Sequence, residues 1–256
     1  MTQVKFFKDL PTLSKLGTTN SLLATENATG KNYRMSAADL KKELGSISID
    51  GVMDNVFIMC HRTSDSRAVC YRPSEWAAQE AAGDVATGVL LIDGGRKLVI
   101  APQEKTSIWS TCQLECGTKQ ADRLLAQELY NGKENCAKIL TNTTLAAEGD
   151  ASAVGWCNAY ERINAGGKGL KAGAWWLPSL GELYLIFANF TKINYALSKI
   201  SGATLLSKTT YWSCTEASAT HAWYLNFSFG GQSYFGNGKS AYQYLVRPVS
   251  EFASAT

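Results

Sequence analysis

The sequence has little of what metal sites, nucleotide sites and membrane spans require. Its only histidines are His61 and His221, and its seven cysteines form no CxxC pair, which argues against a zinc site. It contains no G-x-G-x-x-G or P-loop motif for a nucleotide, and no apolar run long enough to cross a membrane. A net charge of +3 without a basic stripe argues against nucleic acid as a partner. We therefore expect no metal, no cofactor, no nucleic acid and no membrane insertion.

The N-terminal region also lacks the features of a signal peptide. Residues 1–10 contain no apolar core segment and no cleavage site. Residues 1–45 are polar and contain neither cysteine nor tryptophan, so they have too few apolar side chains for an independent core. We expect them to form a small attachment or oligomerisation segment. Its patterns predict a hairpin that turns at residues 27–32 and a short helix at residues 36–44 that begins at Ser36.

The cysteine count is odd, which leaves at least one thiol without a partner inside the chain. Two interpretations stay open at this point. The favoured one is a set of buried, reduced thiols in a protein made in the cytosol. The other is a disulfide between Cys112 and Cys116. The seven positions are Cys60, Cys70, Cys112, Cys116, Cys136, Cys157 and Cys214.

Apolar patterns in the remaining residues predict an α+β fold. Short strands are expected at residues 52–59, 68–71, 88–92 and 97–101, with a tight turn at Asp93-Gly94-Gly95-Arg96. One or two helical turns are expected at residues 74–80, and helices at 119–140 and 152–163. A further helix should begin after Ser179, where Glu182 completes a capping box, and run with a break to about residue 200. We assign residues 46–87 to a β-rich connecting region and 88–252 to the main domain.

Residues 211–245 form the most distinctive segment, because Glu216 and Lys239 are its only charged residues. An ordinary solvated surface would carry more charge, and an ordinary core would carry more Leu, Ile and Val. The segment is rich in Tyr, Trp, Ser, Gly and Asn, which are the residues that binding loops favour. This composition predicts a recognition surface.

Four motifs in order carry a family resemblance. They are Trp175-Trp176-Leu177-Pro178-Ser179-Leu180-Gly181-Glu182-Leu183, Tyr211-Trp212-Ser213-Cys214-Thr215-Glu216, Ala222-Trp223-Tyr224-Leu225-Asn226-Phe227 and Val246-Arg247-Pro248-Val249. Over residues 88–252 the chain resembles the variable proteins of diversity-generating retroelements, of the type common in gut Bacteroides and their phages. These proteins share a C-type-lectin-like fold. The resemblance implies that fold here, with a mixed antiparallel sheet and two to three helices.

In that family a reverse transcriptase rewrites one stretch of the gene at template adenines, which varies some codons and spares others. The resemblance implies that Phe229, Gly231, Ser233 and Phe235 are varied, and period-2 alternation on a strand would place them on one face. Family members usually have Ser at the position of Cys214, which suggests a rewritten codon. Leu245 is also unusual for the family, and is either a varied position or the result of ordinary sequence drift. The full expected ligand-binding set is Cys214, Ala217, Ser218, His221, Phe229, Gly231, Ser233, Phe235, Gly236, Asn237 and Ala241.

A second set is expected to keep the shape of the site. The three residues Trp175, Trp176 and Trp223 are interpreted as buried core rather than ligand platforms. Glu216 and Arg247 either pair across the site or form a solvated salt bridge of little energy. His221 has no catalytic companions and is interpreted as a rewritten surface position. The expected scaffold is Trp175, Trp176, Trp212, Glu216, Trp223, Tyr234 and Arg247.

The resemblance implies a non-enzymatic, receptor-binding protein at the tip of a phage tail fibre. It would be a homotrimer in the virion that binds a bacterial surface glycan or protein and other tail-fibre proteins. One rival is a bacterial cell-surface adhesin, and another is a non-variable structural module of a tail or pilus. A third is an enzyme of the formylglycine-generating type, which needs paired cysteines where only Cys214 lies. No Glu-Pro-Asn, Gln-Pro-Asp or Trp-Asn-Asp triplet supports a calcium lectin.

Overall fold

The computed structural model describes residues 21–25, 32–36, 55–62, 67–233 and 238–252, and the chain divides into two compact units. The first unit spans Met1–Met53. In it β1 (Ser21–Thr25) pairs antiparallel with β2 (Asn32–Ser36), with Thr25 opposite Asn32. This confirms the predicted hairpin. The predicted helix at 36–44 lies outside the described residues except for Ser36, which ends β2.

The second unit, Asp54–Thr256, is an α+β structure that contains two five-stranded sheets. One sheet has the strand order β14-β6-β5-β3-β4, and its buried side chains include Val56, Ile58, Val89, Leu91 and Ile100. We call it the aliphatic sheet. All its pairings are antiparallel. Its strands are β3 (Val56–His61), β4 (Ala68–Tyr71), β5 (Ala86–Asp93), β6 (Arg96–Ile100) and β14 (Val249–Glu251).

The aliphatic sheet corrects the predicted boundary between a connecting region at 46–87 and a domain that starts at 88. β3 pairs directly with β5, with Ile58 opposite Val89, and both side chains are buried in one core. Residues 54–87 are therefore part of the same unit as the rest of the chain. Strand pairing across the proposed boundary could not be inferred from composition.

The turn between β5 and β6 confirms a local prediction. Asp93 pairs with Arg96, and Gly94 and Gly95 connect them with φ angles of 54° and 78°. Positive φ at both central positions is the geometry that a two-residue hairpin loop requires, and glycine adopts it without steric cost.

The other sheet, which we call the aromatic sheet, has the order β12-β11-β10-β13-β7. Its buried side chains include Tyr211, Trp212 and Trp223. The β10–β13 pairing is parallel and the others are antiparallel. Its strands are β7 (Lys105–Ser107), β10 (Thr210–Glu216), β11 (Ala222–Asn226), β12 (Gly231–Ser233) and β13 (Tyr244–Val246).

The described residues contain more and shorter helices than predicted. Instead of one helix at 119–140 there are α3 (Arg123–Gln127) and α4 (Gly132–Ile139). The chain breaks between them because the Leu129 carbonyl accepts hydrogen bonds from Ser179 Oγ at 2.7 Å and from the Gly181 amide at 3.1 Å. The predicted helix at 152–163 is α6 (Ala153–Ala159), and Ile163 belongs to β8 (Arg162–Ile163), which pairs with β9 (Gly169–Leu170).

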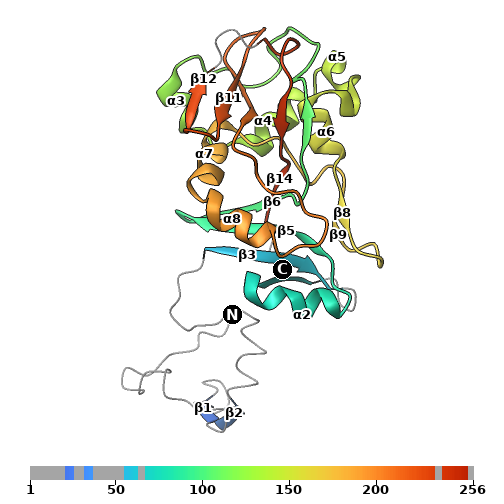
Figure 1. Cartoon of the computed structure of the whole chain (residues 1–256), viewed down its shortest axis with the longest axis vertical. Helices are drawn as coiled ribbons and strands as arrows, with labels where there is room; N and C mark the ends of the chain where they lie inside the picture. Colours follow the sequence, from blue (N-terminus) through green and yellow to red (C-terminus); the bar gives the residue numbers. More distant parts are fainter. Residues whose placement is uncertain (1–20, 26–31, 37–54, 63–66, 234–237, 253–256) are drawn as a thin grey trace. The chain divides into compact units, whose positions relative to one another are not determined.

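Two longer helices, α7 (Leu180–Ala188) and α8 (Phe190–Leu197), follow one another in the chain, and the remaining helical elements are short. Ser179 and Glu182 form the predicted capping box at the start of α7, and α8 follows after a break. α7 packs on β10 and β11, and α8 packs on β3 and β5, so the pair spans both sheets. The short elements are η2 (Pro73–Glu75), α2 (Trp76–Ala81), α5 (Thr143–Ala146) and η3 (Gly149–Ala151). Within the second unit, β11, β12 and α3 lie at the opposite end from β3 and α2 (Figure 1).

The two sheets are joined where the chain crosses between them twice. It leaves β6 for β7 at residues 101–104, and leaves β13 for β14 at Arg247 and Pro248. Arg247 and Glu104, both nearly fully buried, form an ion pair at these crossings, and Arg247 also donates to the Ala101 carbonyl at 2.9 Å. The Arg247 guanidinium therefore holds the two crossings together.

Candidate functional site

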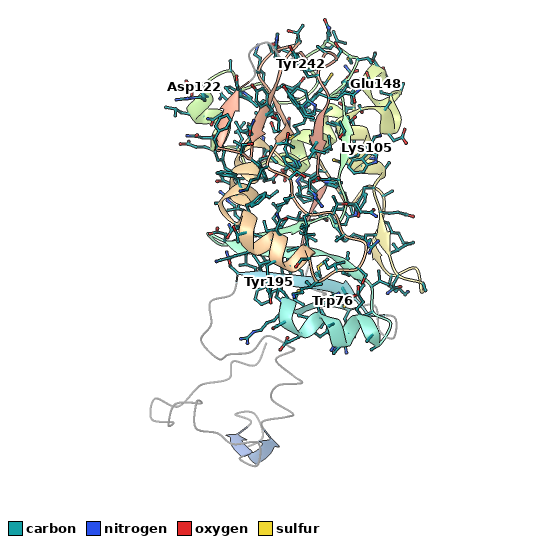
Figure 2. The ribbon with its side chains drawn as sticks, viewed as in Figure 1. Trp76, Lys105, Asp122, Glu148, Tyr195 and Tyr242 are labelled. Atoms are coloured by element: carbon teal, nitrogen blue, oxygen red, sulfur yellow. The ribbon has the colours of Figure 1, made fainter. Side chains whose placement is uncertain are left out.

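The outer side of residues 211–245 carries no formal charge in its described part. The exposed residues at 211–233 and 238–245 are Ser228, Phe229, Ser240, Ala241, Tyr242 and Gln243. Glu216 and Lys239, the only charged residues in the segment, form an ion pair in which both side chains are fully buried. We call the exposed and half-buried surface of this segment the uncharged face. Tyr242 lies at one end of the second unit (Figure 2). Ser228 and Phe229 follow the opposite end of β11 from His221, where Ser228 Oγ donates to the Lys208 carbonyl at 2.8 Å.

The Glu216–Lys239 pair is satisfied on every side. The Glu216 carboxylate accepts hydrogen bonds from the amides of Cys116, at 3.2 Å, and Gly117. Lys239 Nζ also donates to the Leu114 carbonyl at 2.8 Å and lies 4.4 Å from the centre of the Trp109 ring. Buried charges require such partners, because each charge loses its hydration. The pair therefore binds the loop around residues 114–117 to the segment that contains the uncharged face.

This arrangement corrects the predicted contact between Glu216 and Arg247. Glu216 pairs with Lys239, whereas Arg247 pairs with Glu104 at the crossing between the sheets. Both acids are buried, so neither pair is a solvated surface bridge. Residue spacing could not reveal the partners, because Glu104 and Arg247 are 143 positions apart.

Phe229 is the most exposed large apolar side chain among the described residues, at 75%. It lies in the turn between β11 and β12, where the Gly230 amide donates to the Asn226 carbonyl at 2.8 Å. Gly230 has a φ of 73°, and a Cβ there would lie 2.8 Å from the Phe187 ring. Tyr184 Oη donates to the Gly230 carbonyl at 3.2 Å. The backbone thus fixes a turn that holds Phe229 in solvent.

The predicted alternation of Phe229, Gly231, Ser233 and Phe235 on one strand is only partly correct. Gly231 and Ser233 are on β12 and half-buried, but Phe229 precedes the strand. The expected positions Tyr234, Phe235, Gly236 and Asn237 lie outside the described residues. The error has a local cause, because the positive φ of Gly230 interrupts the extended backbone before β12 starts.

Cys214 and Ala217 were predicted on the ligand-binding surface, and the structure corrects both positions. Cys214 is 0% exposed and Ala217 is 4% exposed. Cys214 lies on β10, where six consecutive residues are buried, so no face of that strand reaches solvent. Its sulfur lies 3.5 Å from Asn135 Nδ2, and Asn135 donates to the Cys214 carbonyl at 2.8 Å.

The other expected positions are accessible. Ala241 is exposed, and Ser218 and His221 are half-buried. The His221 ring lies 2.8 Å from Thr220 Oγ1 and 3.3 Å from Ser218 Oγ. The imidazole thus shares hydrogen bonds with neighbouring hydroxyls of its own loop. His221 has the accessible environment that was expected of a surface position.

The tryptophans of the predicted scaffold are buried, and three of them donate to backbone carbonyls. Trp212 Nε1 donates to Ser107 at 3.1 Å, and Trp223 Nε1 donates to Gln120 at 2.6 Å. Trp175 Nε1 donates to Leu170 at 3.3 Å, and Trp176 donates to the Glu182 carboxyl at 3.3 Å. A buried indole needs such an acceptor. The expectation that Trp175, Trp176 and Trp223 belong to the core is confirmed.

Sequence reasoning missed a row of tyrosines beside these tryptophans. The rings of Tyr244 and Trp212 are 4.6 Å apart, and Tyr224 and Tyr242 lie 5.3 Å and 6.1 Å from Tyr244. Tyr242 is 43% exposed, and the other two tyrosines are half-buried. Tyr224 is on β11 and Tyr244 is on β13, with Tyr242 just before β13, and the two strands are not neighbours in sequence. Only the tertiary structure brings them together.

Other site types have little support in the described part of the chain. There, no group of three or more His, Cys, Asp or Glu residues could hold a metal ion, and no helix is long and apolar enough to cross a membrane. Two cavities, of about 180 and about 470 Å³, are lined by residues outside 211–245. The larger lies between Asn55, Arg72 and Tyr195. All seven cysteines are buried and unbridged.

Comparison with known proteins gives little further information. No family model and no curated protein matches the chain. Among solved structures, the chain is similar to a fimbrial protein from Bacteroides ovatus, with 17% sequence identity and a TM-score of 0.40. The similarity covers 77% of this chain and 43% of that protein, so the chain spans less than half the length of the protein it matches.

Proposed function

We propose that the protein is a non-enzymatic, receptor-binding protein with a C-type-lectin-like fold, whose uncharged face binds a molecule on a bacterial surface. The observation that carries this proposal is the burial of Glu216 against Lys239. It removes both charges of residues 211–245 from the surface and leaves Phe229 and Tyr242 exposed there. Exposed aromatic and small polar residues without charge are typical of recognition surfaces.

The rigidity of the aromatic sheet, which supports the face, favours the same function. Indole N–H groups and two buried ion pairs fix the aromatic sheet below the face, while the exposed positions above it have no role in the core. Such a division suits a protein whose exposed residues vary while its shape is kept. We propose that the face is diversified by a retroelement, at accessible positions that include Ser218, His221, Phe229 and Ala241.

The setting we propose is the tip of a phage tail fibre in the virion. There a homotrimer, attached through residues 1–45 to other tail-fibre proteins, would present several copies of the face. Several weak sites on one particle raise avidity through effective concentration. The proposed receptor is a glycan or a protein of the host surface.

Binding to host cells tests the proposal directly. Labelled protein is titrated onto the candidate host, and Phe229→Ala and Tyr242→Ala are compared with Tyr195→Ala. Tyr195 is 51% exposed but lies on α8, far from Tyr242 (Figure 2). The first two changes should weaken binding by about tenfold or more, because truncation of an aromatic anchor costs about 2 kcal/mol. Loss of binding on Tyr195→Ala alone would contradict the proposal.

Two observations test the setting and the diversification. Antibody labelling should locate the protein on phage particles, and labelling of intact cells that carry no phage would instead indicate a cellular adhesin. Gene sequences from several isolates should differ mainly at the accessible positions and spare Trp212, Glu216 and Trp223. Substitutions spread uniformly along the whole chain would exclude a rewritten segment.

A further inference from the structure

A small cavity outside the uncharged face combines apolar and charged side chains. Its volume is about 180 Å³, and residues of β6, β14, α4 and α7 line it. The apolar part of the wall consists of Leu98, Trp176 and Leu185. The described residues that line it all lie outside 211–245. The cavity is therefore a second candidate binding site, separate from the uncharged face.

The Glu182 carboxyl belongs to the wall of this cavity and is only 7% exposed. Its Oε2 accepts hydrogen bonds from the Ser179 amide at 2.8 Å and from Trp176 Nε1 at 3.3 Å. Gly132 makes room for the same oxygen, because an added Cβ there would lie 2.2 Å from it. Among the described residues, no donor bonds to Oε1 and no cation forms an ion pair with the carboxyl. Oε1 is thus the oxygen available to a ligand.

This carboxyl lacks the counter-charge that a buried anion usually has. Burial raises the pKa of Glu182, and the donors at Ser179, Trp176 and Gly132 offset that rise only in part. Buried charges are normally paired, and the strongest pairs combine opposite charge with a hydrogen bond. An ammonium group in the cavity would supply both to Oε1.

Arg96 supplies the opposite charge on the exposed side of the cavity. Its guanidinium carbon lies 3.7 Å from the centre of the Tyr130 ring, which holds the guanidinium while the side chain stays exposed. No carboxylate of the described residues forms an ion pair with Arg96, whereas Lys133 already pairs with Glu251. A planar guanidinium matches a carboxylate through two parallel hydrogen bonds. Arg96 is thus suited to bind the carboxylate of a ligand.

The charges and the volume of the cavity limit the ligand further. The lining contains three cationic and three acidic side chains, which are those of Arg96, Lys97, Lys133, Glu134, Glu182 and Glu251. Because the two sets balance, a ligand without net charge fits best. Pockets for drug-sized ligands have about 300–1,000 Å³, so this smaller cavity suits a single small molecule.

We propose that this cavity binds a free α-amino acid with an apolar side chain. The ammonium group pairs with Glu182 Oε1, the carboxylate pairs with Arg96, and the side chain packs against Leu98, Trp176 and Leu185. Each part of the ligand then meets a part of the cavity of complementary chemistry. This inference does not depend on what the uncharged face binds.

Thermal denaturation of the full-length protein with each standard amino acid tests whether the site exists. A ligand that binds only the folded protein raises Tm, and about 10 mM of each compound reveals even weak binding. We expect a rise with leucine and with apolar amino acids of similar size, and none with lysine or glutamate, which carry a net charge. No rise with any amino acid, or an equal rise with glucose, would overturn the proposal.

Calorimetric titration with leucine and two analogues tests the charged contacts of the ligand. Isocaproate is leucine without the ammonium group, and isoamylamine is leucine without the carboxylate. Each should bind about tenfold or more weakly than leucine, because each loses one charge-assisted hydrogen-bonded pair. An analogue that binds as tightly as leucine would show that the missing group is not recognised, which would overturn the proposal.

Two variants assign these contacts to residues. Glu182→Gln removes the charge and keeps the capping box, which glutamine also forms. It should weaken the binding of leucine about tenfold or more without weakening that of isocaproate. Arg96→Gln, at an exposed position, should weaken leucine similarly without weakening isoamylamine. This selectivity separates a contact with the ligand from a structural defect, which would weaken all three compounds.

Arg123→Gln is the matched control, because Arg123 is exposed on α3 and does not line the cavity. It should bind leucine as the unmodified protein does. If Glu182→Gln does not fold, the comparison of Arg96→Gln with Arg123→Gln still decides the outcome. Equal losses in these two variants, or equal losses for leucine and the analogues, would overturn the proposal.

Discussion

The two sheets of the second unit are stabilised by different interactions. The aliphatic sheet buries residues such as Ile58, Val89 and Leu91, whose contacts are non-directional. The aromatic sheet buries ion pairs and tryptophans whose N–H groups reach loops such as residues 107 and 120. Directional contacts hold irregular segments in defined positions, which close-packed aliphatic side chains do less well. The proposed recognition face lies on the sheet with the directional contacts.

Removal of one buried charge beside the aromatic sheet should cause the largest loss of stability. Lys239→Met leaves the Glu216 carboxylate buried without its cation, and should lower the free energy of unfolding by about 3–5 kcal/mol. Urea denaturation measures this. The control is Lys119→Met, whose partner Glu115 and own side chain are about half exposed, and it should cost less than about 1 kcal/mol. Equal effects would show that burial of the pair is unimportant.

Removal of an aliphatic side chain from the other sheet should lower the free energy of unfolding by a comparable but smaller amount. Leu91 is fully buried on β5, and Leu91→Ala should cost about 3 kcal/mol because it removes apolar contacts and leaves a cavity. Leu124→Ala, at a position 58% exposed on α3, should cost less than about 0.5 kcal/mol. The same urea titrations report both values, and a small effect at Leu91 would contradict the described packing.

A matched pair of glycines separates backbone strain from packing at the Phe229 turn. Gly230 and Gly202 both have a φ of 73°, but only Gly230 has a neighbour, Phe187, where a Cβ would be added. Gly202→Ala should cost about 1 kcal/mol for the left-handed conformation alone. Gly230→Ala should cost more, about 2 kcal/mol, because Phe187 must also move. Thermal denaturation compares them, and equal shifts in Tm would show that the turn is not packed against α7.

The smallest expected change in stability is at the face itself. Phe229→Ala removes a side chain that is 75% exposed, and should alter the free energy of unfolding by less than about 0.5 kcal/mol. The same variant should lose binding to the host surface. A large loss of stability would mean that Phe229 belongs to the core, and the proposed division between support and face would fail.

Several of the confirmed predictions depended only on neighbouring residues. The Gly94-Gly95 turn, the capping box of Ser179 and Glu182, and the β1–β2 hairpin are each specified within a few positions. The helix expected at 119–140 was wrong because the Leu129 carbonyl is used by the start of α7, about fifty residues away. Helical periodicity contains no information about such a distant donor.

The candidate site was only partly predictable for the same reason. Low charge identified the segment, but the sequence could not show that Glu216 and Lys239 neutralise each other inside the protein. Cys214 was predicted on the surface because the resembling family usually has Ser at that position. In the structure, β10 is buried on both faces, so Cys214 does not reach solvent. The tyrosine row was missed because Tyr224 and Tyr244 meet only when β11 and β13 are placed on either side of β10.

The Gly230 turn has a consequence for how such a protein could acquire new partners. Its hydrogen bonds involve Gly230, Tyr184 and the Asn226 carbonyl, while the Phe229 ring lies against Gly231, where it would meet an added Cβ. Other side chains can therefore replace Phe229 while these hydrogen bonds are kept, but the ring at position 229 leaves no room for a side chain at position 231. A lineage could test many side chains at this point with little folding cost, and each trial would change affinity independently of shape.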